Sequence, residues 1–163
     1  MRLIGAVCLL LCCALAGCSA AAQIRSEAEL IRDIRAMLNA ACNQLRSSLP
    51  PVAELLQTLA GQARFRHLGF LHTAAAHAES FPQSWEDAAA ADSALSSALR
   101  QQVTEIGRIL GTLPLAEQLS ALSLCDEQLK NLQSAAEERA RQSGSLFQRL
   151  GVLIGLFLAV LAL

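Results

Sequence analysis

The sequence predicts an all-α protein in which a helical domain lies between two apolar end segments. Apolar residues in the middle of the chain recur at the three- and four-residue spacing of an amphipathic helix, and no useful length alternates with the two-residue period of a half-buried strand. Residues 3–22 and 150–163 contain no Asp, Glu, Lys or Arg. We therefore expect a soluble domain of about five to six helices over residues 23–145, followed by an apolar helix over residues 146–163.

The first two helices of the domain are separated by a pair of prolines. The first should run from about Glu27 to Ser48, because Pro50 and Pro51 cannot continue it. Pro51 then suits the first turn of a second helix, where its missing N–H costs nothing. The apolar faces of these two helices are formed by Leu30, Ile31, Ile34, Met37, Leu38, Ala41, Leu45, Val52, Leu55, Leu56 and Leu59.

The remaining helices follow from local signals. We expect a third, less regular helix over residues 64–79, a loop over residues 80–84, and a short helix that Ser84 caps. An apolar stripe then ends at Gly111, a residue suited to the left-handed conformation at a helix end. Pro114 opens the longest helix, and Gly144 predicts a joint before the last apolar run. The stripe before Gly111 is formed by Leu95, Leu99, Val103, Ile106 and Leu110.

Charge and aromatic content argue against a nucleic-acid partner. All fourteen acidic and eleven of the thirteen basic residues lie within residues 23–145, which therefore carry a net charge of −3. The chain has five Phe, one Trp and no Tyr. Proteins that bind nucleic acid show a basic excess and, for single strands, aromatic platforms on which bases stack. Neither feature is present.

The first apolar segment supports two opposite interpretations. Residues 15–18 read Leu-Ala-Gly-Cys, the pattern that a lipoprotein signal peptidase recognises. Cleavage there would remove residues 1–17 as a signal peptide and leave Cys18 as a site of lipidation, with the domain outside the cell membrane. Alternatively, residues 3–22 remain as an uncut transmembrane helix. The choice decides the compartment of the domain.

The carboxy-terminal segment and the arginines beside both segments favour the uncut helix. Residues 146–163 are apolar all round, and 18 residues at 1.5 Å each span roughly 27 Å, close to the hydrocarbon core of about 30 Å. Because Lys and Arg prefer the inner face of a membrane, the arginine distribution places the domain in the cytoplasm. The arginines on the domain side are Arg25, Arg32, Arg35, Arg139, Arg141 and Arg149, against Arg2 alone on the other side.

No set of residues indicates catalysis, a metal or a cofactor. His67, His72 and His77 recur every five residues, a step that turns a helical side chain by about 140°, so the three do not converge. The metal, phosphate and nucleophile motifs HExxH, GxxxxGK and GxSxG are all missing. We therefore expect a protein that is not an enzyme and binds no cofactor.

Two features suggest contacts with other proteins. Gly151 and Gly155 lie four residues apart in the terminal apolar helix, which would let another membrane helix approach closely, including one from a second copy of the chain. Two glycines in a hydrophobic tail can also occur without such a role. Glu54 stands near the start of the second helix, either as an acid favoured by the helix dipole or as an interface charge.

The layout of the whole chain resembles the stage III sporulation protein AB family of spore-forming bacteria. Six pieces carry the resemblance through their order and spacing. They are LIGAV near the start, IRDIRAMLNAA (31–41), PVAELLQTLA (51–60), SWEDAAA (84–90), IGRILGTLPLAEQLSAL (106–122) and SLFQRLGVLIGLFLAVLAL (145–163).

The resemblance implies a mother-cell membrane protein whose cytosolic helical domain is similar to the F platform component of type II secretion systems. It implies a non-enzymatic scaffold of the channel between mother cell and forespore, contacting the secretion-type ATPase, stage III sporulation protein AA, and other channel subunits. Glu54 matches the family's Pro-Leu-x-Glu position and is the expected partner contact. Where members carry Glu in the first soluble helix, this chain has Cys42 and Gln44, and we retain Gln44 as a second candidate contact. The alternative is an acylated lipoprotein with an extracytoplasmic helical binding domain.

Overall fold

The computed structural model describes residues 26–162 and the side chains of residues 26–141. The chain divides into two compact units, of which Glu29–Gln133 is one, and residues 26–28 and 134–162 are the described part of the other. Within the described residues six α-helices and no strand occur, so the all-α prediction is confirmed. The elements are a first helix (26–48), α2 (Val52–Ala60), the short 3-10 helix η1 (Ala63–Phe65), α3 (Gly69–Ala76), the 3-10 helix η2 (Ala78–Ser80), α4 (Gln83–Ala91), α5 (Ser97–Ile109) and α6 (Leu115–Ala162).

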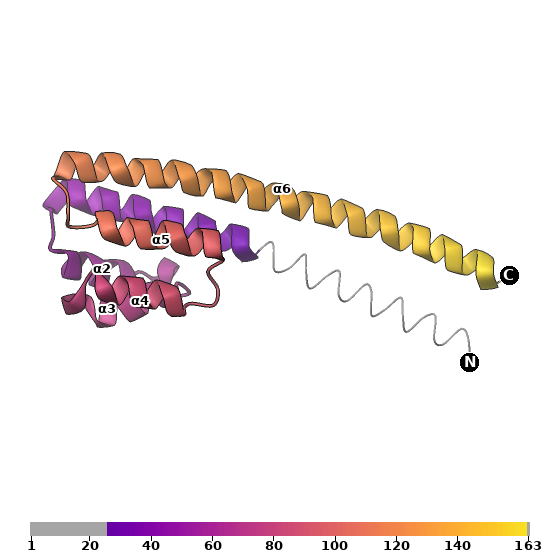
Figure 1. Ribbon diagram of the computed structural model, residues 1–163, viewed down its shortest axis with the longest axis horizontal. Coiled ribbons are helices and arrows are strands. Elements are labelled where there is room, and N and C mark those ends of the chain that lie inside the picture. Colours follow the sequence, from indigo (N-terminus) through magenta and orange to yellow (C-terminus); the bar gives the residue numbers. More distant parts are fainter. Residues whose placement is uncertain (1–25, 163) are drawn as a thin grey trace. The chain divides into compact units, whose positions relative to one another are not determined.

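The unit Glu29–Gln133 has two layers (Figure 1). The first helix, α5 and the beginning of α6 form one layer, and the shorter helices α2, α3 and α4 form the other. α3 packs against both α2 and α4, and α4 packs against α5. The core between the layers is almost entirely apolar, as expected from the hydrophobic stripes of the sequence.

Trp85 on α4 is the largest side chain of this core, and it is only 1% exposed. Its indole Nε1 donates a 2.6 Å hydrogen bond to the carbonyl oxygen of Val103 on α5, so the one polar atom of the ring has a partner. The ring of Phe70 meets it edge-on, with the centroids 5.3 Å apart. Gly107 on α5 leaves room for the ring, because a Cβ at that position would lie 2.6 Å from Nε1.

Arg35 joins the first helix to α6 within the same unit. Its Nε and Nη2 donate to the two carboxylate oxygens of Asp126 at 2.9 and 3.1 Å, and its Nη1 donates to Gln133 at 3.0 Å. The hydrogen bonds to Asp126 raise the pKa of the Arg35 guanidinium. This bidentate geometry favours one alignment of the first helix with α6, because a planar guanidinium donates two parallel hydrogen bonds to a carboxylate only when the two groups face each other.

Polar side chains also organise the connection between α4 and α5. Arg100 on α5 donates from Nε to the carbonyl of Ala89 at 3.1 Å, and from Nη2 to the carbonyls of Asp92 and Leu95 at 3.2 Å each. The last carbonyls of a helix have no partner within the helix, and Arg100 supplies one. The Asp92 carboxylate in turn accepts from the backbone N–H of Phe70 at 3.1 Å, in the first turn of α3.

The first helix ends in a strained residue. Leu49 has φ 45°, in the left-handed region that costs an L-residue other than Gly, Asn or Asp roughly 1–2 kcal/mol. Pro50 and Pro51 follow and precede α2, and the N–H of Leu55 donates to the carbonyl of Pro51 at 3.0 Å. The predicted end at Ser48 is therefore confirmed. Pro51 lies one position earlier than predicted, because α2 begins at Val52 and Pro51 is its N-cap residue, with ψ 146°, instead of a residue of the first turn. Gly111 after α5 has φ 75°, which confirms its predicted left-handed conformation.

Three local predictions are wrong. The expected third helix over residues 64–79 is broken into η1, α3 and η2. Phe65, Leu68, Phe70 and Leu71 are all buried, and their spacing does not fit one face of a continuous helix, so the chain bends to bury all four.

The other two errors concern helix boundaries. Ser84 does not cap α4, which already begins at Gln83 after Pro82, and Ser84 lies buried inside the helix. The joint at Gly144 does not occur, because α6 continues from Leu115 to Ala162. An interior glycine costs a helix about 1 kcal/mol relative to alanine, which good helix formers on both sides can offset.

Candidate functional site

Glu54 lies in the first turn of α2, and its side chain is exposed. The opposite side of α2 is firmly buried, since Leu55 and Leu56 are both 0% exposed. The hydroxyl of Thr58 donates to the backbone carbonyl of Glu54 at 2.8 Å, and this hydrogen bond does not engage the Glu54 carboxylate. Among the described residues no basic side chain forms an ion pair with Glu54. The carboxylate is therefore presented to solvent on a well-packed helix.

Gln44, the second candidate contact, has a different setting. It lies one turn before the end of the first helix, and its side chain is half-buried. Its amide oxygen Oε1 is buried without a hydrogen-bond partner, whereas its backbone carbonyl accepts from the hydroxyls of Ser47 and Ser48. No hydrogen bond joins Gln44 to Glu54 in the described structure, so the structure presents Glu54 more openly than Gln44.

The other sequence candidates lie where the structure describes little or nothing. Cys18 and the predicted span over residues 3–22 lie outside the described residues. Gly151 and Gly155 belong to the backbone of α6, in the stretch whose side chains are not described. Among the described residues, no helix combines the length and hydropathy that crossing a membrane requires. The two predicted spans therefore stay predictions.

Three exposed leucines of the described region were missed by the sequence reasoning: Leu49, Leu113 and Leu124, of which the first two lie between helices. Leu49, between the first helix and α2, is 62% exposed, and Leu113, between α5 and α6, is 40% exposed. Leu49 and Leu113 lie next to helix boundaries that were predicted well from the sequence. Leu49 could have been identified, because it stands just past a helix end, where glycine is usual. Glu117, in the first turn of α6, is a further exposed acid near this boundary.

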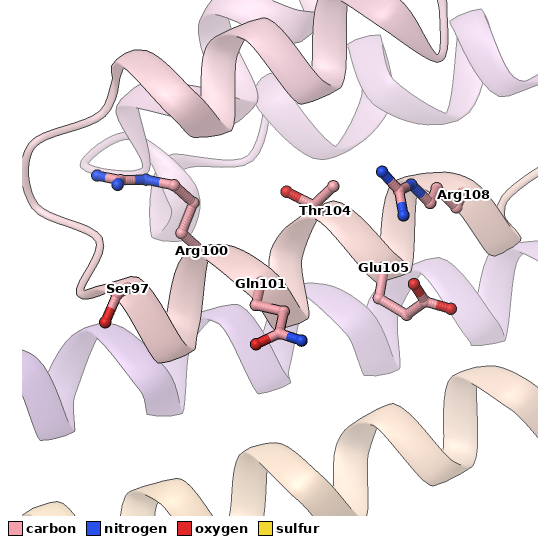
Figure 2. A pocket seen from close by; sticks show the side chains of 6 residues that line it. All are labelled: Ser97, Arg100, Gln101, Thr104, Glu105 and Arg108. Atoms are coloured by element: carbon pink, nitrogen blue, oxygen red, sulfur yellow. The ribbon is translucent and has the colours of Figure 1, made fainter.

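A shallow pocket of about 360 Å³ lies along α5. Its six lining residues all come from this helix and are labelled in Figure 2: Ser97, Arg100, Gln101, Thr104, Glu105 and Arg108. In the view of Figure 2, Arg100, Thr104 and Arg108 extend upward and Gln101 and Glu105 extend downward, all from the face of α5 that lines the pocket. Arg100 already binds backbone carbonyls, and Arg108 donates to Glu86 at 2.9 Å. The polar groups therefore do not converge on a point where a substrate could react.

The histidines and cysteines of the described region also form no reactive group. His67 Nε2 lies 3.1 Å from the carboxylate of Asp33, and the structure describes no group of three residues that could hold a metal ion. Burial raises the pKa of the thiols of both Cys42 and Cys125, and Glu105 and Cys42 raise that of Cys125 further. Because the thiolate is the nucleophile, both cysteines are poor nucleophiles at neutral pH.

The family model described as stage III sporulation protein AB matches residues 2–163. No curated protein and no solved structure matches the chain. The match spans nearly all 163 residues, including the segment that carries Glu54. The resemblance found in six separate pieces of sequence is thereby confirmed, and this chain belongs to the stage III sporulation protein AB family.

Proposed function

We propose that this protein is a non-enzymatic scaffold subunit of the channel between mother cell and forespore, and that its helical domain docks a cytosolic secretion-type ATPase, stage III sporulation protein AA. Membership of a stage III sporulation family supports the sporulation role. The observation that carries the docking role is the exposed carboxylate of Glu54, which lacks an ion-pair partner among the described residues.

The packing of α2 supports this role for Glu54. Leu55, Leu56 and Leu59 lie in the core, so α2 holds the position of Glu54 relative to the rest of the unit. An exposed carboxylate on a rigid helix loses little side-chain and backbone freedom when it pairs with a basic residue of a partner. Such a charge steers association and selects the partner more than it adds raw affinity.

The proposed location is the mother-cell membrane, with the domain in the cytoplasm. The apolar segments 3–22 and 146–163 would supply two spans, and the arginines beside them favour the inner face. In this arrangement the domain would be tethered next to the membrane, where an ATPase bound to it could act on the other channel subunits.

Reversing the charge of Glu54 tests the docking role. We expect Glu54→Lys in the full-length, detergent-extracted protein to weaken binding of the purified ATPase at least tenfold, about 1.4 kcal/mol, and to lower the spore count. Glu79→Lys is the matched control, because Glu79 is also an exposed acid without an ion pair in the described region, and it lies on η2. Unchanged binding and spore count for Glu54→Lys, with the fold intact by circular dichroism, would contradict the proposal.

The lipoprotein alternative rests on one specific feature, the Leu-Ala-Gly-Cys pattern that ends at Cys18. The intact mass of the protein extracted from membranes separates the two. We expect a mass that begins at or next to Met1, since the basic residues favour an uncut span. A mass that lacks residues 1–17 and carries a diacylglycerol on Cys18 would place the domain outside the membrane and remove the basis for ATPase docking.

A further inference from the structure

Cys42 and Cys125 lie on the two helices that the contacts of Arg35 align. Cys42 belongs to the first helix and is half-buried, whereas Cys125 lies on the buried face of α6 and is only 3% exposed. Within the unit Glu29–Gln133 the two helices run in opposite directions (Figure 1). Both thiols are free, so each can form a new covalent bond.

The register of the two helices brings the cysteines opposite each other. Arg35 on the first helix contacts Asp126 and Gln133 on α6. Cys42 lies seven residues, or about two helical turns, after Arg35, and therefore on the same face of the helix. In an antiparallel pair, two turns forward on one helix correspond to two turns back on the other. Cys42 therefore faces the two turns of α6 that end at Asp126, and these include Cys125.

Electrostatics and helix packing agree with this register. Burial raises the pKa of the Cys125 thiol most, and the charges of Glu105 and of the Cys42 thiolate raise it further. A like charge acts in this way only from a short distance. Packed helices have axes about 8–10 Å apart and Cα atoms about 2.3 Å from each axis, which leaves about 3–5 Å between directly facing Cα atoms. A small displacement along the helices gives the separation of about 4.4–6.8 Å that a disulfide spans.

We propose that Cys42 and Cys125 form a dithiol pair that a low-molecular-weight disulfide converts into an internal disulfide, which locks the first helix to α6. In the first step the thiolate of Cys42, the more accessible cysteine, attacks one sulfur of the oxidant R–S–S–R and releases R–S⁻. In the second step the Cys125 thiolate attacks the Cys42 sulfur of the mixed disulfide and releases the second R–S⁻. The two protons lost by the protein go to the released thiolates, so the oxidant is reduced to two thiols as the pair is oxidised.

The burial of the pair sets how fast it reacts. Because burial raises the pKa of both thiols, few thiolates exist at neutral pH and the first step is slow. Once the mixed disulfide has formed, the closeness of the second thiol speeds the second step. The pair therefore responds to sustained oxidation instead of a brief pulse.

The disulfide would act on the two helices that lead to the apolar segments of the chain. The first helix follows residues 3–22, and α6 continues into residues 146–162. The cross-link closes the chain between residues 42 and 125, a loop long enough to restrict the unfolded chain strongly, so oxidation should stabilise the fold. This inference does not depend on ATPase docking and would stand if that proposal failed.

The experiment treats the purified full-length protein in mild detergent with oxidised glutathione under native conditions. Tryptic digestion without reductant should give peptide 36–46 joined to peptide 109–130, which carry Cys42 and Cys125. The melting temperature followed by circular dichroism should rise by about 5–15 °C, and dithiothreitol should reverse the rise. Linkage should be about ten times faster at pH 8 than at pH 7, because the thiolate fraction rises tenfold per pH unit below the thiol pKa.

Cys42→Ala and Cys125→Ala are the matched variants, since each removes one thiol and leaves the other in place. Neither should show the rise in melting temperature with oxidant, and Cys125→Ala should accumulate glutathione on Cys42 instead. Four further cysteines lie within residues 3–22, and the peptide map separates their products from the link between Cys42 and Cys125.

Three outcomes would overturn the inference. In the first, Cys42 of the unmodified sequence stays free or keeps glutathione without forming linked peptides, which would show that Cys125 is out of reach. In the second, linkage occurs only after unfolding in urea. In the third, linkage leaves the melting temperature equal or lower, which would show that the disulfide distorts the helices instead of locking them. None of these outcomes alters the test of docking by Glu54→Lys.

Discussion

Replacing Trp85 by alanine is expected to reduce the free energy of unfolding by about 3–5 kcal/mol, the range for deleting a large aromatic side chain from a core. The indole is 1% exposed and contacts Phe70 edge-on. Its loss leaves a cavity between α4 and α5 and removes the hydrogen bond to the carbonyl of Val103. Domains of this size are stable by only about 5–15 kcal/mol, so the variant should lose a large part of its stability.

Thermal unfolding of the full-length protein measures this effect, with an expected fall in melting temperature of about 10–20 °C. Leu124→Ala is the control for loss of an apolar side chain without a cavity, because Leu124 is 55% exposed, and it should change stability by less than about 0.5 kcal/mol. If Trp85→Ala and Leu124→Ala lowered the melting temperature equally, the packing of α4 against α5 around Trp85 would be refuted.

Replacing Arg100 by alanine is expected to reduce the free energy of unfolding by about 2–3 kcal/mol. The guanidinium donates to three backbone carbonyls, those of Ala89, Asp92 and Leu95, at 3.1–3.2 Å. Hydrogen bonds from a charged donor contribute roughly 1.5–3 kcal/mol each where water is excluded. This site is only partly buried, so in the variant water can donate to some of the carbonyls that Arg100 no longer binds. Urea unfolding followed by circular dichroism gives the change.

Arg108→Ala provides the matched control for Arg100, since both arginines lie on α5. Arg108 is exposed and pairs with Glu86, and a surface ion pair of this kind contributes little to stability because water and salt screen it. Arg100→Lys should fall between Arg100→Ala and the unmodified protein, because one ammonium group cannot reach all three carbonyls in the geometry of a guanidinium. Equal losses for Arg100→Ala and Arg108→Ala would show that the carbonyl contacts do not matter.

The long helices could be predicted from sequence because their signals are local. Apolar residues at helical spacing, Pro50 and Pro51, and the left-handed Gly111 all act within a few residues of the boundary they define. The region from residue 63 to residue 80 could not be predicted in this way. Its shape follows from which side chains the neighbouring helices bury, and that depends on residues far away in the chain, such as Asp92, which binds the start of α3.

The candidate site was predictable in part. Glu54 was identified from its place after the two prolines and from the family resemblance, and the structure adds that its carboxylate is exposed. Leu49 could have been identified from its place just past a helix end, where glycine is usual. Leu113 offers no such signal, because leucines near helix ends are usually buried by a neighbouring element that the sequence does not reveal. Gln44 was a candidate because of its position in the first helix. The sequence could not predict that its side chain is half-buried, because burial depends on how the first helix packs against the other helices.

The fit of Trp85 against Gly107 limits how this protein can change through evolution. Any side chain at position 107 would collide with a ring that is held by its hydrogen bond to Val103, and a smaller residue at position 85 would leave a void beside the glycine. A substitution at either position alone is therefore expected to give a less stable protein. We therefore expect an alternative filling of this core, with a smaller ring at position 85 and a larger residue at position 107, to keep the stability of the protein only when both positions change together.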